Sequence, residues 1–386
     1  MKIGIDIRLI GKKQTGSEAV FFNLTKNLAR LDSENEYKLF TDIIDKNIIE
    51  EIGKNLEIKD KNNFEIISLS TKNKFTWNFW TLPKYLRKNP VDIYLTQYIT
   101  PWFVPKKVKI ATIIHDISFE FYPQFIKFWD LLFLKKLIPK SLKRADKIIA
   151  VSRFTQDEII KYYKIDPKKV DWFYNAVSED FKKQDISEEK IKSVKEKYKL
   201  PEKYILYLGT LQPRKNIPAL VEAFALLKIE INLKIKLNSF KLVIAGGKGY
   251  NYDNLIDDVV KKNNLTEDVI FPGYIDEEDK AALIKGAEIF VFPSFYEGFG
   301  VPIIEAMSLG VPTIISDILP HREIAGNATL FFSPQIPGEI TQRIKEIIGN
   351  SLIRNSLLKN GKLQAEKFYW QKSAEKILDI FSEIDY

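Results

Sequence analysis

The stretch "IFVFPSFYEGFGVPIIEAMSLGVPTIIS" (289–316) alternates between two kinds of local structure. It begins with "IFVFPS" and ends with "PTIIS", two apolar runs of the kind that form buried strands. Between them, Pro302 suits the first turn of a helix and Gly310 suits its end. A strand, a helix and a second strand in this order predict a βαβ unit, and therefore a parallel sheet.

The same alternation extends from this stretch along the whole chain. Nine further runs predict strands: "KIGIDIR", "YKLFTDI", "EIISLS", "DIYLTQ", "KIATIIHD" and "KIIAVS" in the first half, then "YILYLGT", "KLVIAGG" and "VIFPG" in the second. Helical patterns separate many of them, so we expect two doubly wound α/β domains facing across a cleft. The charged segment "KKQDISEEKIKSVKEKYKLPEK" (182–203) predicts a linker. The expected domains are 1–180 and 181–366.

Composition narrows the classes of function. A chain of 386 residues suggests about two domains, and the absence of cysteine excludes disulfides, thiolate metal sites and thiol nucleophiles. The start "MKIGIDIRLI" is typical of a strand rather than a signal peptide, and the absence of cysteine fits a reducing cytoplasm. The net charge of +8 has two open explanations, an anionic partner or a lysine-rich surface. Neither explanation requires nucleic acid.

In each half, the loop that follows the first strand carries a candidate ligand site. In the first, Thr15 and Glu18 have the spacing of a capping box, which places Gly16 at a helix start, where a ligand can approach the backbone closely. In the second, Arg214 and Lys215 stand before a predicted helix, where open α/β sheets bind ligands. Each feature has a plainer explanation, a well-capped loop in the first case and a solvated surface pair in the second.

Two glutamates flank the loop of the opening stretch. Glu297 lies in the loop and Glu305 just inside the helix, and between them lie the amides of Phe299, Gly300 and Val301. A helix start of this kind favours anions, and flanking carboxylates can accept hydrogen bonds from sugar hydroxyls. The alternatives are an exposed loop acid for Glu297 and a charge–dipole contact for Glu305. The paired carboxylates of a glycosidase act from opposite sides of the glycosidic bond that is cleaved. Two acids on one loop–helix unit are better placed to bind along one side of a ligand.

Taken together, these motifs resemble a known family. The chain is similar to family 4 retaining glycosyltransferases, which have the two-Rossmann-domain architecture called GT-B. The resemblance spans nearly the whole length, and its most specific part is "FPSFYEGFGVPIIEAMSLGVPTI" (292–314). The other motifs are Gly16, "HD" (115–116), "RADKIIAVSRFTQDEI" (144–159), "YNAVSEDF" (174–181), "GTLQPRKN" (209–216), "IAGGKGY" (244–250) and "FPGYIDEEDKAAL" (271–283). The ending, 367–386, resembles the family's last helix, which crosses back to the first domain.

The resemblance assigns roles to individual residues. His115, Glu297, Arg214 and Lys215 would be catalytic: the histidine beside the donor hexose, Glu297 on its hydroxyls, and the two cations on the diphosphate. Glu305 would bind the ribose. The other expected donor-binding residues are Gly16, Gly209, Gly246, Gly247, Gly273, Tyr274, Phe299, Gly300 and Val301. Many members carry Arg where this chain has Thr210, so the relative roles of Arg214 and Lys215 stay open. No cofactor and no divalent metal are expected.

The resemblance also implies substrates. The polysaccharide subgroup that the motifs favour implies GDP-mannose as donor, with UDP-hexoses as the alternative, and a saccharide or lipid-linked saccharide as acceptor. A nucleotide-binding homologue without turnover and a phosphorylase are the other classes. Within 121–147, Phe125, Trp129, Leu132, Phe133 and Lys136 are expected on overlapping helix faces, which predicts peripheral contact with an anionic membrane. Alternatively these aromatic residues pack under the sheet. We expect "WNFWTLPKYL" (77–86) to be buried.

Overall fold

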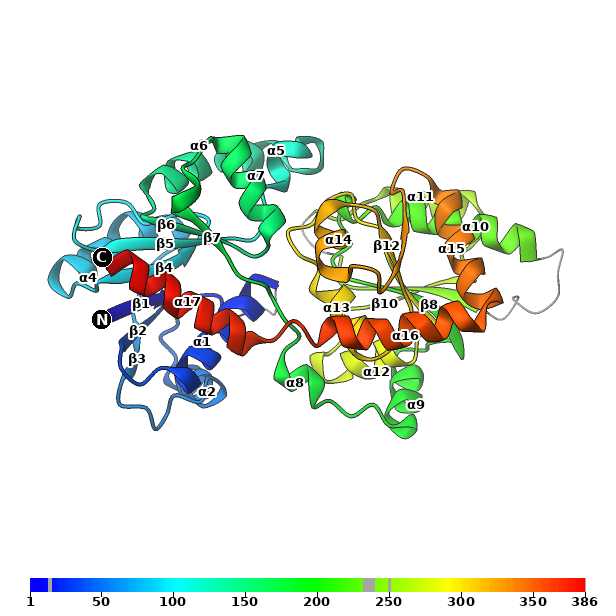
Figure 1. Ribbon diagram of the computed structural model, residues 1–386, viewed down its shortest axis with the longest axis horizontal. Helices are drawn as coiled ribbons and strands as arrows, with labels where there is room; N and C mark the ends of the chain where they lie inside the picture. Colours follow the sequence, from blue (N-terminus) through cyan, green and yellow to red (C-terminus); the bar gives the residue numbers. More distant parts are fainter. Residues whose placement is uncertain (13–15, 232–239, 249–250, 386) are drawn as a thin grey trace. The chain divides into compact units, whose positions relative to one another are not determined.

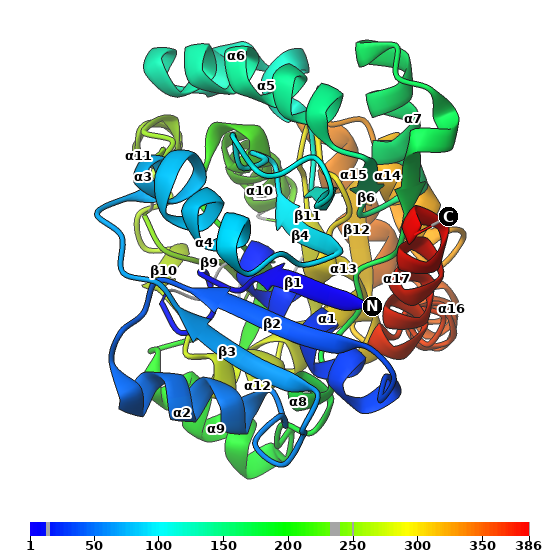
Figure 2. The same cartoon turned by 90° about the vertical axis from the view of Figure 1, so that its left-hand side faces the viewer.

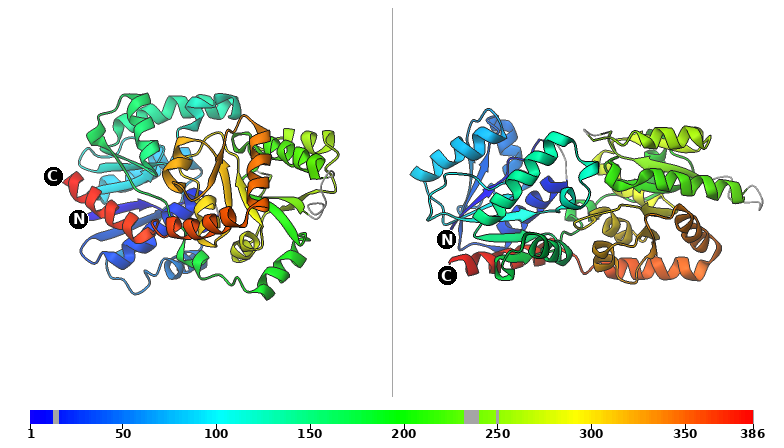
Figure 3. Two further views of the ribbon diagram at one scale, coloured as in Figure 1. Left: turned by 45° about the vertical axis from the view of Figure 1, so that its right-hand side comes forward. Right: turned by 90° about the horizontal axis from the view of Figure 1, so that it is seen from above.

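The computed structural model describes residues 1–12, 16–231, 240–248 and 251–385. The chain divides into two compact units. The first contains Met1–Glu120, Phe128–Asn175 and Tyr369–Tyr386, and the second contains Phe121–Lys127 and Ala176–Phe368. Each unit has its own parallel sheet with helices on both faces (Figures 1 and 3). The prediction of two doubly wound α/β domains is confirmed.

The sheet of the first unit has seven strands in the order β3-β2-β1-β4-β5-β6-β7, and every neighbouring pair is parallel. The strands are β1 Lys2–Asp6, β2 Glu36–Thr41, β3 Phe64–Ser68, β4 Ile93–Gln97, β5 Lys109–Ile114, β6 Lys147–Ala150 and β7 Val170–Trp172. The central strands are buried on both faces because helices cover both. The six predicted strands are present, whereas the three-residue edge strand β7 was not predicted.

The helices of the first unit pack on this sheet (Figure 2). They are α1 Gly16–Leu31, α2 Lys46–Asn55, α3 Lys74–Thr76, a π-helical turn Trp77–Thr81, α4 Leu82–Lys88, α5 Ser118–Phe121, α6 Phe128–Arg144, α7 Arg153–Tyr163 and α17 Trp370–Asp385. Trp77 and Leu86 lie in a core cluster with Phe40, Tyr94 and Ile110 of the sheet. The terminal helix α17 packs against α1, so the two ends of the chain meet in one unit.

The second unit has a six-stranded parallel sheet in the order β10-β9-β8-β11-β12-β13. Its strands are β8 Lys203–Leu208, β9 Phe240–Ala245, β10 Val269–Gly273, β11 Ile289–Phe292, β12 Thr313–Ser316 and β13 Leu330–Phe332. Its helices are α8 Glu179–Lys182, α9 Glu188–Lys197, α10 Ile217–Ile231, α11 Leu255–Lys262, α12 Lys280–Lys285, α13 Val301–Ser308, α14 Leu319–Ala325, α15 Pro337–Gly349 and α16 Ser351–Ala365. The order reverses between β8 and β11, which is where such sheets bind ligands.

Two features differ from the sequence predictions. The charged segment 182–203, predicted as a linker, contains α9, which packs on α12. Lys190 and Lys197 of α9 both bind the buried Asp279, at 2.6 and 2.5 Å, so the charge density reflects ion pairs within a domain. Residues 121–127, expected in a continuous first domain 1–180, belong to the second unit. There the Asn251 amide donates to the Phe125 carbonyl at 2.5 Å.

Candidate functional site

Three charged side chains meet beyond the carboxyl ends of β8 and β11. The Lys215 ammonium lies 2.5 Å from one carboxylate oxygen of Glu297, and the Arg214 guanidinium lies 3.0 Å from the other. Glu297 is only 6% exposed. The structure therefore brings together the two expected phosphate-binding cations and the expected sugar-binding acid, which are far apart in the sequence. Two adjacent cations and an acid can bind a phosphorylated sugar at both of its ends.

Local backbone structure holds this cluster in place. Arg214 and Lys215 lie in a single 3₁₀ turn, Pro213–Lys215, that follows β8. The turn ends at Asn216, whose φ of 55° is left-handed, a conformation that asparagine tolerates. The Asn216 amide donates to the carbonyl of Pro293 at 3.1 Å, and the Phe295 N–H donates to the carbonyl of Arg214 at 2.9 Å. The turn after β8 and the loop after β11 are thus fastened together.

The charges around Glu297 determine its protonation. Burial alone would raise the pKa of Glu297, but the charges of Arg214 and Lys215 outweigh burial and hold the pKa well below its ordinary value. Glu297 is therefore ionised at neutral pH. The Lys215 ammonium also lies over the ring of Phe292, 4.9 Å from its centre, which favours the cation further.

Glu305 lies in α13 and has a different partner. Its carboxylate accepts a hydrogen bond from the Lys280 ammonium at 2.7 Å, and it is 4% exposed. Burial raises the pKa of Glu305 although the charge of Lys280 opposes the change. The second oxygen, Oε2, is buried without a hydrogen-bond partner among the described residues. A buried acceptor of this kind can receive a ligand hydroxyl, as the proposed ribose contact requires.

The loop between the two glutamates leads directly into α13. Gly300 precedes the helix with a φ of 112°, which favours glycine, and Pro302 occupies its first turn as predicted. The Phe299 ring is buried against Phe368, with 5.6 Å between ring centres. This loop therefore directs its apolar side chain inward, so that the backbone at 299–301 forms the helix N-terminus.

Glycines end three neighbouring strands of the second sheet. Gly209 donates to the Ala245 carbonyl at 3.1 Å, and Gly246 donates to the Gly273 carbonyl at 2.8 Å. A Cβ atom on Gly246 would lie 1.9 Å from the Gly209 carbonyl oxygen, so only glycine fits there. Gly247 has open space around its Cα, and Tyr274, after β10, is 57% exposed. Close approach of backbone to backbone explains Gly246, whereas Gly247 leaves room for a ligand.

The other two expected residues lie in the first unit. His115 follows β5, and its Nε2 lies 2.9 Å from the Gln97 side-chain oxygen. Burial lowers the pKa of His115 to about 4, so the ring is neutral at pH 7. Gly16 opens α1, and a Cβ there would meet nothing within 4 Å. Thr15 of the predicted capping box lies outside the described residues, and the Glu18 carboxylate accepts from the Gly11 N–H at 3.2 Å.

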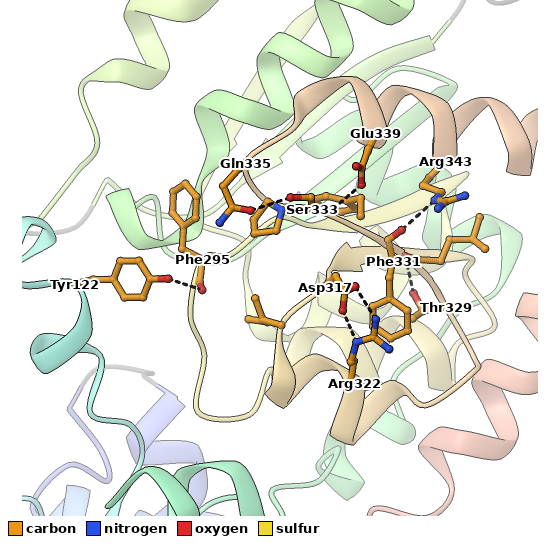
Figure 4. Close-up of a pocket in the computed structure, with 14 residues that line it drawn as sticks. Tyr122, Phe295, Asp317, Arg322, Thr329, Phe331, Ser333, Gln335, Glu339 and Arg343 are labelled. Atoms are coloured by element: carbon orange, nitrogen blue, oxygen red, sulfur yellow. Dashed lines mark hydrogen bonds and ion pairs between the residues drawn. The ribbon is translucent and has the colours of Figure 1, made fainter. Parts of the chain in front are cut away.

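The second unit contains a cavity of about 630 Å³ (Figure 4). Its walls come from Tyr122, from β13 and from the segments that follow β11, β12 and β13. Figure 4 shows the Asp317–Arg322 ion pair, the Ser333 N–H bonded to Glu339, and Tyr122 bonded to the Phe295 carbonyl. None of the expected donor-binding residues lines the cavity. Phe295 connects it to the loop that carries Glu297.

The first unit exposes an aromatic and basic surface. On α6, Trp129 is 76% exposed, and Phe128 and Leu132 are also exposed, whereas Ile138 and Leu142 are buried. The alternative that the aromatic residues of this stretch pack under the sheet is therefore wrong for Phe128 and Trp129, and the aliphatic Leu132 is exposed as well.

Two details of this region differ from expectation. Phe125 is not on the same helix face, because it lies in the second unit and stacks on Phe295 with 5.8 Å between ring centres. Within 77–86, Trp77 is buried as expected but Trp80 is 70% exposed. Phe75, also exposed, contacts Phe133 of α6, so α3 and α6 belong to one surface.

Sequence reasoning missed two residues that hold the site. Lys280 binds Glu305 and lies within a quoted motif, but nothing in its spacing showed which of many nearby acids it would bind. Asn216 follows Lys215 directly and has a left-handed backbone. Because asparagine is enriched in that conformation, its presence after the two cations is a signal in the sequence from which the turn could have been predicted. Both residues act through contacts with segments distant in sequence.

Within the described ranges, no group of three or more histidine, aspartate or glutamate side chains is arranged to hold a metal ion. None of the helices that the structure describes is both long enough and apolar enough to span a membrane.

Two family models match the chain. "Glycosyltransferase Family 4" matches residues 15–181, and "Glycosyl transferases group 1" matches residues 188–364, which contain the Arg214–Lys215–Glu297 cluster. A curated relative, the O-antigen chain mannosyltransferase B of Escherichia coli, is 30% identical over 72% of each chain. This chain is a glycosyltransferase that belongs to the family described by these two models, "Glycosyltransferase Family 4" and "Glycosyl transferases group 1". The serotype-specific mannosyltransferase WbdA of Escherichia coli is 32% identical over 63% of this chain, which spans 29% of that longer protein.

Solved structures support the architecture of this glycosyltransferase. HepE of Anabaena, in complex with UDP-glucose, aligns with 99% of this chain and 100% of its own, with a TM-score of 0.73 and 14% identity. At that identity the likeness shows the fold, which is the GT-B architecture of two Rossmann-like domains.

Proposed function

We propose that this glycosyltransferase moves mannose from GDP-mannose to a saccharide or lipid-linked saccharide in the synthesis of a cell-surface polysaccharide. The observation that carries the proposal is the Arg214–Lys215–Glu297 cluster at the carboxyl edge of the second sheet. The mannose assignment follows the two curated relatives, which are both named as mannosyltransferases, one of them of the O-antigen chain.

The cluster suits the chemistry of a nucleotide sugar. As the glycosidic bond breaks, negative charge develops on the diphosphate, and Arg214 and Lys215 are placed to stabilise it. Glu297, ionised and fixed between them, accepts hydrogen bonds from hexose hydroxyls. Glu305 accepts from the ribose through its unpaired oxygen. These cations would do the work that a divalent metal does in other enzymes, so we propose turnover without metal.

Further parts of the proposal concern stereochemistry and the first unit. We propose retention of the anomeric configuration, with His115, neutral at pH 7, beside the hexose and Gly16 against the diphosphate. The first unit would bind the acceptor and contact the membrane. A lysine lies beside aromatic residues of both α3 and α6, because the Lys74 ammonium is 5.7 Å from the centre of the Phe75 ring and 5.3 Å from the centre of the Phe133 ring. Basic and aromatic surfaces of this composition bind anionic membranes reversibly.

A donor panel tests the proposal. Purified protein is incubated with GDP-, UDP- and ADP-sugars, and nucleotide release and thermal stabilisation are both followed. The proposal predicts GDP-mannose as the best donor, turnover that survives EDTA, and an α-linked product by NMR. Preference for a UDP-hexose would favour the second candidate, which the fold likeness to the UDP-glucose complex of HepE supports. Binding without turnover on any acceptor would favour a nucleotide-binding homologue.

A further inference from the structure

A buried polar network lies under the loop that carries Glu297. Ser316, the last residue of β12, donates its hydroxyl hydrogen to the carbonyl of Ser294 at 2.6 Å. His321 of α14 places Nδ1 2.9 Å from the Ser316 carbonyl and 3.0 Å from the Ser316 hydroxyl. All three residues are completely buried. Bulk water therefore does not compete for these hydrogen bonds.

The hydrogen bonds fix the tautomer of His321. A carbonyl oxygen can only accept, so the contact to the Ser316 carbonyl requires a hydrogen on Nδ1. The Ser316 hydroxyl hydrogen is already committed to Ser294, which leaves the hydroxyl oxygen as a second acceptor for Nδ1–H. Nε2 is then a bare acceptor, and it is buried without a hydrogen-bond partner among the described residues. Burial lowers the pKa of His321 to about 4, consistent with a neutral ring.

The network fixes the exit of β11 from one side while Asn216 fixes it from the other. Asn216 binds the carbonyl of Pro293, and Ser316 binds the carbonyl of the next residue, Ser294. Glu297 follows three residues later. The ring of Phe292 lies between the two sides, 5.8 Å from the His321 ring and 4.9 Å from the Lys215 ammonium. Two consecutive carbonyls and one ring thus connect His321 to the charged cluster.

We propose that His321 is a positioning residue for Glu297. In its Nδ1–H tautomer it orients the Ser316 hydroxyl, which fixes the turn after β11 so that the Glu297 carboxylate lies between Arg214 and Lys215. The inference rests on the proposed function of that cluster. A histidine suits the place because it offers one donor to Ser316 and an apolar ring face to Phe292.

The tautomer can be tested without any substrate. The chain contains only two histidines, His115 and His321, so ¹⁵N-histidine labelling gives two ring systems, which the His321→Asn variant assigns. We expect the His321 ring to carry hydrogen on Nδ1 and none on Nε2 throughout pH 5.5–8. A ring protonated on Nε2, or charged in this range, overturns the proposal. This result is independent of whether the protein turns over a nucleotide sugar.

Two substitutions then separate positioning from packing. The asparagine amide nitrogen occupies nearly the position of Nδ1, whereas the glutamine nitrogen reaches the position of Nε2. His321→Asn should keep turnover of the best donor within about threefold, and His321→Gln should lower kcat by about tenfold to a hundredfold, since small misplacement of a catalytic group is costly. Ser316→Ala should resemble His321→Gln. The affinity for free nucleotide, which Glu297 does not contact in the proposal, should change little in all three.

The outcomes separate the two proposals. Equal kcat for the asparagine and glutamine variants, at equal melting temperature, contradicts the positioning role. A wild-type protein without turnover on any donor refutes the proposed function instead, and the NMR result then still decides whether the His321–Ser316 network exists as described. If the variants unfold, the tautomer measurement on the wild-type protein remains decisive.

Discussion

Replacing Glu297 by glutamine tests the charged cluster through protein stability. In the wild-type protein the carboxylate compensates two cations, at 3.0 Å from Arg214 and 2.5 Å from Lys215. Removing one partner of a buried ion pair costs about 3–5 kcal/mol, because the remaining charge is left in a poorly solvating environment. The side chains of Arg214 and Lys215 keep 16% and 10% exposure, so water offsets part of this cost. We therefore expect Glu297→Gln to lower the unfolding free energy by roughly 2–4 kcal/mol.

The expected loss is large enough for a melting assay. In a domain of roughly 150–250 residues, 1 kcal/mol moves the melting temperature by about 2–4 °C, so the shift should be roughly 4–16 °C. Glu346→Gln is a matched control, since that glutamate lies 2.8 Å from Arg343 in the same unit but is partly exposed. Its loss should cost less than about 1 kcal/mol.

A nucleoside diphosphate should reverse much of the Glu297→Gln effect. Its phosphates bring negative charge to the two uncompensated cations, and a ligand that binds only the folded state raises stability as its concentration exceeds Kd. The gain in melting temperature with GDP or UDP should therefore be larger in Glu297→Gln than in the wild-type protein. The reasoning is refuted if the variant melts like the wild-type protein, or if the nucleotide stabilises it no more than wild type.

Three further predictions concern pH, glycine and membranes. Because folding lowers the pKa of Glu297, its contribution to stability is present above about pH 4.3 and is lost as pH falls. Folding raises the pKa of Glu305, so the contribution of Glu305 to stability is present at low pH and is lost as pH rises. Melting wild type, Glu297→Gln and Glu305→Gln from pH 3 to 8 checks this, because the loss of the Glu297 contribution begins below about pH 4.3. Variant curves parallel to the wild-type curve would contradict it. Gly246→Ala should destabilise the protein by about 2–4 kcal/mol, because the added Cβ would clash with the Gly209 carbonyl oxygen and the φ of 143° is unfavourable for alanine. Gly16→Ala, where a Cβ meets nothing, should melt like wild type yet slow donor turnover. Equal melting temperatures for the two variants would refute the packing argument. In liposome flotation, wild type should bind anionic vesicles at low salt and release at high salt; Trp80→Ser with Trp129→Ser should weaken binding, whereas Leu352→Ser, an exposed control in the second unit, should not.

Much of the fold could be predicted from sequence because parallel strands covered on both faces must be continuously apolar. The runs around β1, β5, β8 and β11 have this character. The edge strands β7 and β13 were missed because each is only three residues long and is paired on one side alone. The segment around α9 was misread as a linker because its lysines are compensated by Asp279, a residue far along the chain.

The parts of the candidate site that depend on local backbone structure could be predicted from the sequence, whereas the contacts between distant segments could not. Gly300, Pro302 and Gly310 are local signals, since each is set by the backbone of its own turn or helix. The pairing of Arg214 and Lys215 with Glu297, and of Lys280 with Glu305, depends on which strand ends lie side by side in the sheet. No spacing rule within a single sequence contains that information. The His321 network was invisible for the same reason.

The central claim, that Arg214 and Lys215 bind the diphosphate of the donor, is tested most directly by calorimetric titration of the double variant Arg214→Ala/Lys215→Ala. Each charge-assisted contact contributes about 1.5–3 kcal/mol, so losing both should weaken binding of the nucleoside diphosphate by at least about a hundredfold. Affinity for the matching nucleoside, which lacks phosphates, should stay within about threefold of wild type. An unchanged Kd for the diphosphate in a folded double variant would contradict the account.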